Sequence, residues 1–174
     1  VVYVSLGSIL RLAPDRYAAL ATRLGQSGSR LIWSLPQADG EIVRRVLKDP
    51  QRHYITDYVP QPRLLSDPAI RAFVTHGGAS SVQEALIAGV PMLCIPFYSD
   101  GGYISSLVER LGVGLRIWKQ QITRPDLTEA LGRLLSETSF AARSQVVAEQ
   151  ISGADARAQA KRYLNDLAAL APGS

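Results

Sequence analysis

Short apolar runs rich in β-branched residues alternate with segments of helical periodicity along nearly the whole chain. Such alternation is typical of successive βαβ units, in which a parallel sheet is covered on both faces. We expect strands at 1–5, 30–35, 53–58, 72–75, 92–95 and 113–117. We expect helices at 14–26, 41–47, 80–88, 103–111, 125–136, 140–151 and 154–170. The sequence therefore predicts an α/β fold: a Rossmann-like, doubly wound parallel sheet of about six strands with helices on both faces and extra C-terminal helices.

The size and composition of the chain suit one domain with its own core. The 174 residues are 47% hydrophobic and 20% charged, which excludes a disordered chain. The single cysteine, Cys94, excludes an internal disulfide, and the two histidines have no metal-ligand spacing to it. We therefore expect no metal site and no structural zinc. No apolar run approaches the roughly 18 residues of a membrane span, so we expect a soluble, cytoplasmic protein without a membrane segment.

The basic residues are dispersed. Nineteen lysines and arginines against 15 acidic residues give a net charge of +4, and the arginines are spread along the chain rather than gathered on one stripe. Proteins that bind a polyanion usually gather their basic residues on one surface, so from this dispersed charge we expect no nucleic-acid partner. A small anionic ligand is compatible with this charge.

One segment, from Thr75 to Glu84, follows a predicted strand directly and leads into a helix. Glycines there let the backbone approach an anion closely, the expected serine caps supply N–H and hydroxyl donors, and the helix N-terminus adds partial positive charge. These features together favour a diphosphate. The candidate ligands are His76, Gly78, Ser80 and Ser81.

Glu84 lies about one helical turn after these serines, on the same side of the helix. Its carboxylate would repel an anion, so its natural partners are hydroxyl donors such as those of a ribose. The alternative is a capping box, in which Glu84 and a serine satisfy free amides at the helix start.

Three other site patterns do not fit the chain. The lysine-bearing phosphate loop is absent, and Gly112-Val113-Gly114 lacks the third glycine of a dinucleotide fingerprint. Ser80 is not followed two residues later by the glycine of a nucleophile elbow, and His53 is the only other histidine. Hydrolase chemistry is therefore disfavoured.

Several motifs in fixed order resemble the donor-binding, C-terminal half of the UDP-glycosyltransferases. This family has two Rossmann-like domains (the GT-B fold) and includes glucuronosyl-, glucosyl- and macrolide glycosyltransferases. The resemblance covers essentially the whole chain and preserves motif order. The motifs are Val4-Ser5-Leu6-Gly7-Ser8, Leu31-Ile32-Trp33-Ser34, Tyr58-Val59-Pro60-Gln61, Leu64, the His76 to Glu84 segment, Gly89-Val90-Pro91, and Ile95-Pro96 through Asp100.

The resemblance implies a role for each matching position. Tyr58 would stack on the uracil and the Val59 backbone would pair with its edge, while Gln61 and Glu84 would hold the ribose hydroxyls. Asp100 would accept hydrogen bonds from the sugar. The diphosphate would be bound by His76, Ser81 and adjacent backbone, with help from Ser8 and Ser34. Trp33, in contrast, is expected in the core. Three of these positions also have a purely structural alternative: Tyr58 as a core residue, Gln61 as a helix cap and Asp100 as an ordinary turn residue.

Two positions depart from the family pattern. Ser80 stands where the family commonly has asparagine, and Gly101 stands where it has glutamine after the aspartate. The missing glutamine removes an amide that would bind the sugar, so the sequence does not predict which sugar is recognised.

The resemblance also implies what the chain lacks. The strand at 1–5 begins at once, and we interpret 1–174 as a single donor-binding domain whose N-terminal acceptor domain is not present. In the family the catalytic base is a histidine of that other domain, so we expect no catalytic residue here and no cofactor or metal. We expect half of an inverting glycosyltransferase that moves a hexose from a UDP-sugar to a small-molecule acceptor hydroxyl. The alternatives are a non-catalytic nucleotide-sugar-binding subunit that needs a partner chain, or a dinucleotide-binding oxidoreductase domain.

Overall fold

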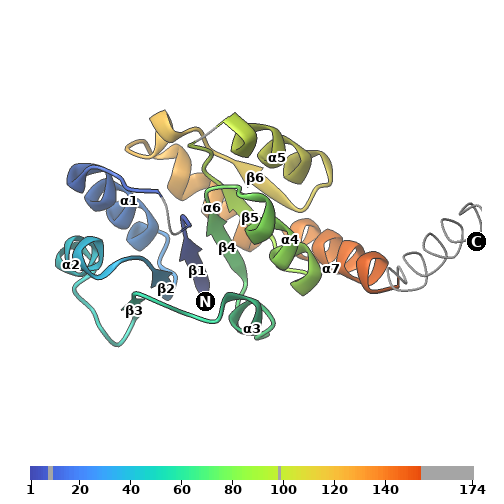
Figure 1. Ribbon diagram of the computed structural model, residues 1–174, viewed down its shortest axis with the longest axis horizontal. Helices are drawn as coiled ribbons and strands as arrows, with labels where there is room; N and C mark the ends of the chain where they lie inside the picture. Colours follow the sequence, from blue (N-terminus) through green and yellow to red (C-terminus); the bar gives the residue numbers. More distant parts are fainter. Residues whose placement is uncertain (8–9, 98, 154–174) are drawn as a thin grey trace, which may run out of the picture.

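The computed structural model describes residues 1–7, 10–97 and 99–153. In that part of the chain, strands and helices alternate as the sequence predicts (Figure 1). The strands are β1 (Val2–Ser5), β2 (Leu31–Ser34), β3 (His53–Thr56), β4 (Ala72–Thr75), β5 (Met92–Cys94) and β6 (Gly114–Arg116). The helices are α1 (Pro14–Gln26), α2 (Gln37–Val46), α3 (Gln61–Leu65), α4 (Ala79–Ala88), α5 (Ser99–Arg110), the 3-10 helix η1 (Lys119–Gln121), α6 (Asp126–Ser136) and α7 (Thr138–Gly153).

All six strands form one parallel sheet in the order β3-β2-β1-β4-β5-β6. The order reverses between β1 and β4, because the chain first builds outward through β2 and β3 and then returns to the other side of β1. Such a switch point opens a crevice at the carboxyl ends of the strands, where ligands bind in folds of this type. The predicted doubly wound fold is confirmed.

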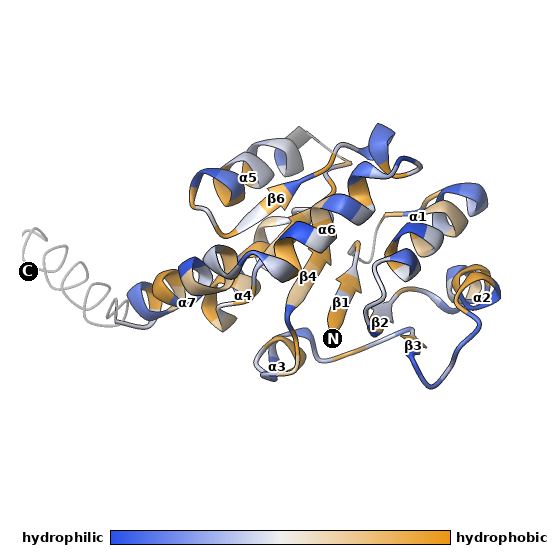
Figure 2. Cartoon of the chain, turned by 180° about the vertical axis from the view of Figure 1, so that it is seen from behind, coloured by the Kyte–Doolittle hydropathy of each residue, from blue (hydrophilic) through white to orange (hydrophobic). Residues whose placement is uncertain are grey.

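Each strand contributes to two cores because its side chains alternate between the faces of the sheet. In β1, Val2 and Val4 pack on one side with Trp33, which is fully buried, as expected. Tyr3 packs on the other side with Phe73. Residues of α1, α2 and α6 cover the first face, and residues of α3, α4, α5 and α7 cover the second (Figures 1 and 2).

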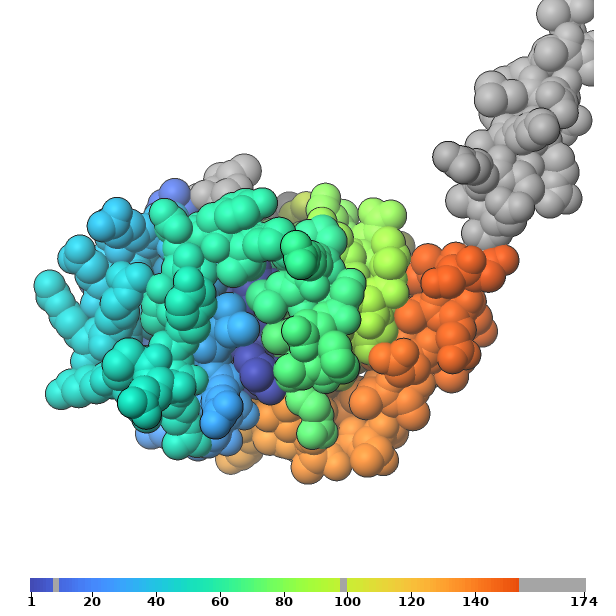
Figure 3. Space-filling model, turned by 90° about the horizontal axis from the view of Figure 1, so that it is seen from below, coloured from blue at the N-terminus to red at the C-terminus, as the bar shows by residue number. Residues whose placement is uncertain are grey.

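The two ends of the molecule are built from different parts of the chain. Seen from below, α2 and β3 lie at one end and α7 lies at the other (Figure 3). Strand β1 lies inside the sheet, between β2 and β4.

Most predicted elements are confirmed to within a few residues. The helix predicted at 14–26 is observed with these bounds, and its buried residues follow helical spacing: Tyr17, Leu20, Ala21 and Leu24. Helix α4 ends at Gly89, whose φ of 67° is the left-handed conformation that favours glycine at a helix end.

Several expected helix boundaries are wrong. Helix α2 begins at Gln37, four residues early, because its polar first turn carries no apolar periodicity. Helix α6 has Pro125 as its N-cap, and α7 begins at Thr138, two residues before its expected start, and includes Gly153, two residues after its expected end. The helix expected at 154–170 lies outside the described residues. Among the residues that are described, no helix combines the length and the apolar character that crossing a bilayer requires.

Candidate functional site

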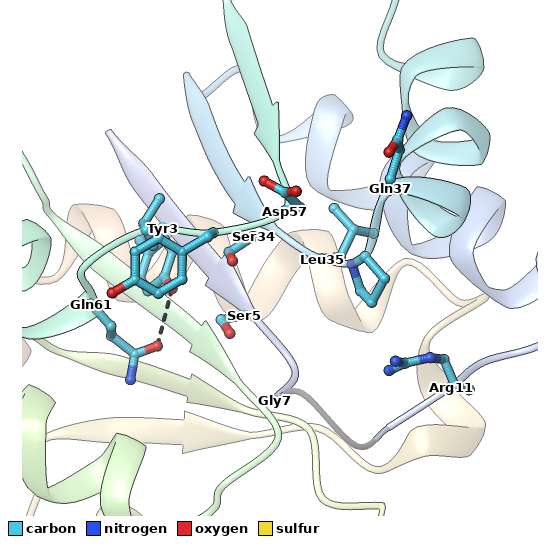
Figure 4. Close-up of a pocket in the computed structure, with 12 residues that line it drawn as sticks. Tyr3, Ser5, Gly7, Arg11, Ser34, Leu35, Gln37, Asp57 and Gln61 are labelled. Atoms are coloured by element: carbon cyan, nitrogen blue, oxygen red, sulfur yellow. Dashed lines mark hydrogen bonds between the residues drawn. The ribbon is translucent and has the colours of Figure 1, made fainter.

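A cavity of about 520 Å³ opens at the carboxyl ends of β1, β2 and β3 (Figure 4). Its floor is the side of the sheet that carries Ser5 and Ser34, which face each other across the β1–β2 pairing. Because α3 has only five residues and packs toward α4, this part of the sheet stays open. The cavity is lined by Tyr3, Ser5, Gly7, Arg11, Ser34, Leu35, Pro36, Gln37, Asp57, Tyr58, Val59 and Gln61.

Tyr58 and Val59 form one wall of this cavity. Tyr58 is 73% exposed, so it is not the core residue that was the alternative for this position. A ring in this position offers a flat face to a planar ligand, and stacking on such a face requires no particular hydrogen-bond pattern. The structure thus places Tyr58, the predicted base-stacking residue, in the lining of the same cavity as Ser34 and Gln61.

Gln61 connects the cavity to helix α4. Its Nε2 donates to Glu84 Oε2 at 2.7 Å and to Ser81 Oγ at 3.3 Å. Its Oε1 accepts a hydrogen bond from the Tyr3 hydroxyl at 3.0 Å (Figure 4). Gln61, Ser81 and Glu84, which were predicted separately, therefore form one polar cluster, and Tyr3 is a member that sequence reasoning missed.

The capping roles expected for the serines of α4 are wrong. The N-cap is Gly78, and among the described residues no side chain caps the helix. Ser80 is exposed in the first turn, and Ser81 accepts from Gln61 instead. Glu84 likewise takes its hydrogen bond from Gln61 rather than from the backbone at the helix start, so the capping-box alternative is not observed. The first N–H groups of α4 consequently remain available to an anion.

His76 stands between two glycines at this helix start. A Cβ built on Gly7 would lie 2.9 Å from the imidazole Cε1, and a Cβ on Gly78 would overlap Nε2. Only glycine at both positions leaves room for the ring. Gly7 also lines the cavity, so it joins the imidazole to the space beside Ser5 and Ser34.

Burial lowers the pKa of His76, and the Asp100 carboxylate acts in the opposite direction. The imidazole is half-buried, and its Nδ1 has no hydrogen-bond partner among the residues that the structure describes. Since Nδ1 is itself buried, the nitrogen suited to contact an anion is Nε2, which lies on the Gly78 side of the ring beside the helix amides, and the imidazole can gain charge when an anion binds.

Asp100 lies in the first turn of α5 and is exposed. Its Oδ1 accepts a hydrogen bond from the backbone N–H of Gly101, at 2.9 Å, so part of its acceptor capacity is used locally. A Cβ on Gly101 would lie 3.1 Å from the His76 carbonyl oxygen, so a glycine here lets α5 start close against the His76 loop. Ser8 lies outside the described residues.

The structure thus gathers most predicted site residues around one crevice. Ser34, Tyr58, Val59 and Gln61 line the cavity, Ser81 and Glu84 join it through Gln61, and His76 and Gly78 join it through Gly7. Across residues 1–7, 10–97 and 99–153, no three histidine, cysteine, aspartate or glutamate side chains gather as a metal site.

An all-parallel sheet of this order, with a polar cavity at the carboxyl ends of β1, β2 and β3 and a glycine-flanked helix N-terminus, defines a Rossmann-like α/β domain. Comparison with known proteins narrows this class. The family model described as UDP-glucoronosyl and UDP-glucosyl transferase matches residues 1–147. The chain therefore belongs to this family.

Individual relatives agree with the family assignment. An anthocyanidin 3-O-glucosyltransferase 2 from Fragaria ananassa is 35% identical over 144 residues, covering 79% of this chain and 30% of that protein. A mouse (Mus musculus) UDP-glucuronosyltransferase 2A2 is 30% identical over 145 residues, covering 80% and 26%. The chain therefore spans less than a third of the length of these curated relatives.

Solved structures match the fold over nearly the whole chain. A crystal structure of a UDP-glucose: anthocyanidin 3-O-glucosyltransferase in complex with UDP superposes with a TM-score of 0.85 at 27% identity, covering 95% of this chain and 39% of that one. The glycosyltransferase of kitacinnamycin gives a TM-score of 0.77 at 26% identity, covering 95% and 42%. Both matched chains are much longer than this one.

Proposed function

We propose that this chain is the donor-binding half of an inverting glycosyltransferase that moves a hexose from a UDP-sugar to a hydroxyl of a small-molecule acceptor. The observation that carries the proposal is the anion cradle at the cavity edge, where Gly7, His76 and Gly78 meet the N-terminus of α4. Family membership and the UDP bound in a matched crystal structure support a uridine nucleotide as the ligand.

The proposed pose runs from the cavity to the cradle. The uracil stacks on Tyr58 beside the Val59 backbone, the ribose hydroxyls meet Gln61 and Glu84, and the diphosphate lies against His76 and the first amides of α4. Ser34 lies on the cavity floor, and Ser81 and Ser80 lie at the helix start, near the phosphates. Asp100 is proposed to accept hydrogen bonds from the sugar.

In the proposed reaction, this chain stabilises the diphosphate leaving group. In an inverting transfer the acceptor oxygen attacks the anomeric carbon while the bond to the diphosphate breaks, so negative charge grows on the diphosphate. The helix amides and His76 stabilise that charge. We assign no catalytic base to this chain. The base and most acceptor contacts belong to the proposed N-terminal domain, and the cytoplasmic location stays a prediction.

The first test is nucleotide selectivity. Calorimetric titration of the chain should show binding of UDP and UDP-sugars and much weaker binding of ADP and NAD. His76→Ala and Glu84→Ala should each weaken UDP about tenfold, because each removes a charge-assisted or hydroxyl-accepting hydrogen bond. His53→Ala is the matched control, since His53 begins β3 at the amino end of the strands, away from the cavity at their carboxyl ends, and should leave UDP affinity unchanged. Equal affinity for UDP and ADP would contradict the proposal.

The second test uses pH. Because burial holds the pKa of His76 below its usual 6.5, the free protein carries a neutral imidazole at pH 7.5. A bound diphosphate favours the imidazolium, so binding takes up a proton and affinity rises as pH falls toward the pKa of the free protein. A UDP-sugar is the suitable ligand, because its diphosphate lacks the terminal phosphate group that itself titrates near pH 6.

We expect UDP-sugar affinity to rise severalfold between pH 7.5 and pH 5.5. His76→Gln should give a flat profile over the same range, whereas His53→Gln should retain the slope. A slope that survives His76→Gln would mean that another group near the diphosphate takes up the proton.

A further inference from the structure

Tyr3 stands at the floor of the cavity and is held rigidly. Its side chain is 1% exposed, and its ring stacks on Phe73 with centroids 4.9 Å apart and planes 12° from parallel. Because the ring is packed inside the core, its hydroxyl occupies a fixed position beside the Gln61 amide, to which it is hydrogen-bonded (Figure 4). Neither the family motifs nor the site predictions included this residue.

The Tyr3 hydroxyl acts as a hydrogen-bond donor to Gln61. Burial raises the pKa of Tyr3, so the phenol keeps its proton. The nearby Ser5 and Ser34 hydroxyls act in the opposite direction on this pKa. The phenol proton is therefore free to point at Gln61 Oε1, 3.0 Å away.

The Gln61 amide accepts this hydrogen bond through its oxygen and donates through its nitrogen to helix α4. Its two N–H groups are used by Glu84 Oε2 at 2.7 Å and Ser81 Oγ at 3.3 Å. If the amide were turned over, its oxygen would face the Glu84 carboxylate, which only accepts, and the hydrogen bond from Tyr3 would be lost. The arrangement leaves a second lone pair on Gln61 Oε1 and the remaining acceptor sites of Glu84 for a ligand.

We infer that Tyr3 is a positioning residue whose hydroxyl fixes the direction of the Gln61 amide, so that Gln61 Oε1 and the Glu84 carboxylate form a pair of acceptors for the two ribose hydroxyls of a bound nucleotide. The inference rests on the proposed function and deepens it. It assigns discrimination between ribose and deoxyribose nucleotides to a chain of hydrogen bonds that starts at Tyr3 on β1 and runs through Gln61 to α4.

The test compares UDP with 2′,3′-dideoxy-UDP on the purified chain by calorimetry. Tyr3→Phe keeps the ring and its stacking on Phe73 but removes the hydroxyl. We expect it to weaken UDP about 3- to 10-fold and to leave 2′,3′-dideoxy-UDP within twofold of the wild type, since only the ribose contacts depend on the amide. The ratio of the two affinities should therefore fall, which a general loss of structure would not produce.

A control variant and a double variant test whether the effect of Tyr3→Phe is specific and acts through Gln61. Tyr17 is also a buried tyrosine and donates to Asp39 Oδ2 at 3.2 Å, away from Gln61, so Tyr17→Phe should leave the affinity ratio unchanged. Gln61→Met removes the amide at a half-buried position, and adding Tyr3→Phe to it should change the ratio no further.

The outcomes separate the inference from the function on which it rests. Failure of the wild-type chain to bind UDP would overturn both. Binding by the wild type, with a ratio unaffected by Tyr3→Phe or a loss equal for the two nucleotides, would overturn the role of Tyr3 alone. A further drop in the ratio when Tyr3→Phe is added to Gln61→Met would show that Tyr3 does not act through the amide.

Discussion

Gly78→Ala should weaken UDP binding about 30- to 100-fold while leaving the fold intact. The added Cβ would overlap the Nε2 atom of His76, and Gly7 closes the other side of the imidazole. The ring must therefore leave its place and move into the space that an anion needs. The loss exceeds that of His76→Ala, because a displaced ring both stops donating and blocks the cradle; the expected factor corresponds to about 2–3 kcal/mol.

The backbone itself tolerates the substitution. Gly78 has φ of −66° and ψ of 141°, an extended conformation that alanine adopts without strain. The thermal midpoint should therefore stay near that of the wild type, which distinguishes a blocked site from an unfolded one.

The decisive measurement is a double-mutant cycle with His76→Ala. Once the imidazole is gone the new methyl group has nothing to displace, so Gly78→Ala should then cost less than about threefold in UDP affinity. Near wild-type affinity in the single variant would show that the diphosphate does not lie beside the imidazole. A full additional loss in the double variant would show that the methyl group itself obstructs the ligand.

The strands and most helices could be predicted because they depend on local pattern. Alternating apolar residues place Val2 and Val4 on one face, and the spacing from Tyr17 to Leu24 marks the buried side of α1. Helix α3 could not be predicted in this way. It has five residues and a proline in its first turn, so it carries no periodicity to detect.

Single site residues could be predicted where a motif identifies the position. Contacts between segments that are distant in the sequence could not be predicted. Gln61 and Glu84 were predicted from their own segments, but the hydrogen bond between them depends on how α3 packs against α4. Tyr3 was missed for the same reason, since it lies 58 residues from Gln61. The available signal was strand alternation, which places Tyr3 and Ser5 on the face of β1 opposite Val2 and Val4.

The glycines show the same limit. The sequence correctly draws attention to the pair at 77–78, yet it expects the neighbouring serines to cap the helix. In the structure Gly78 itself is the N-cap, and the space above it is filled by an imidazole. Glycine is required there because the imidazole of His76, two residues earlier, occupies the space of a Cβ. Conformational propensities of the local sequence do not predict such a contact.

Gly114→Ala should destabilise the domain by about 3 kcal/mol, at the upper end for overpacking. Gly114 pairs with Met92 between β5 and β6, and a Cβ there would overlap the Met92 carbonyl oxygen and lie 2.7 Å from Val108 Cγ1. The carbonyl belongs to β5, which is paired on both sides with β4 and β6 and cannot rotate away, so the edge strand β6 must separate from it. For a chain of this length the thermal midpoint should fall by roughly 6–12 °C.

Gly132→Ala is the matched control, because it is the same chemical change in a different setting. Gly132 is exposed in the middle of α6, and a Cβ there would have no described atom within 4 Å. Alanine favours a helix interior over glycine by about 1 kcal/mol, so the midpoint should rise by roughly 2–4 °C. Opposite signs for the two variants would show that close strand packing, and not backbone freedom, explains the glycine of β6. A stable Gly114→Ala variant would mean that β6 can move away from β5 without loss, and because α5 packs on β6, the position of Asp100 at the start of α5 would then not be fixed by the sheet.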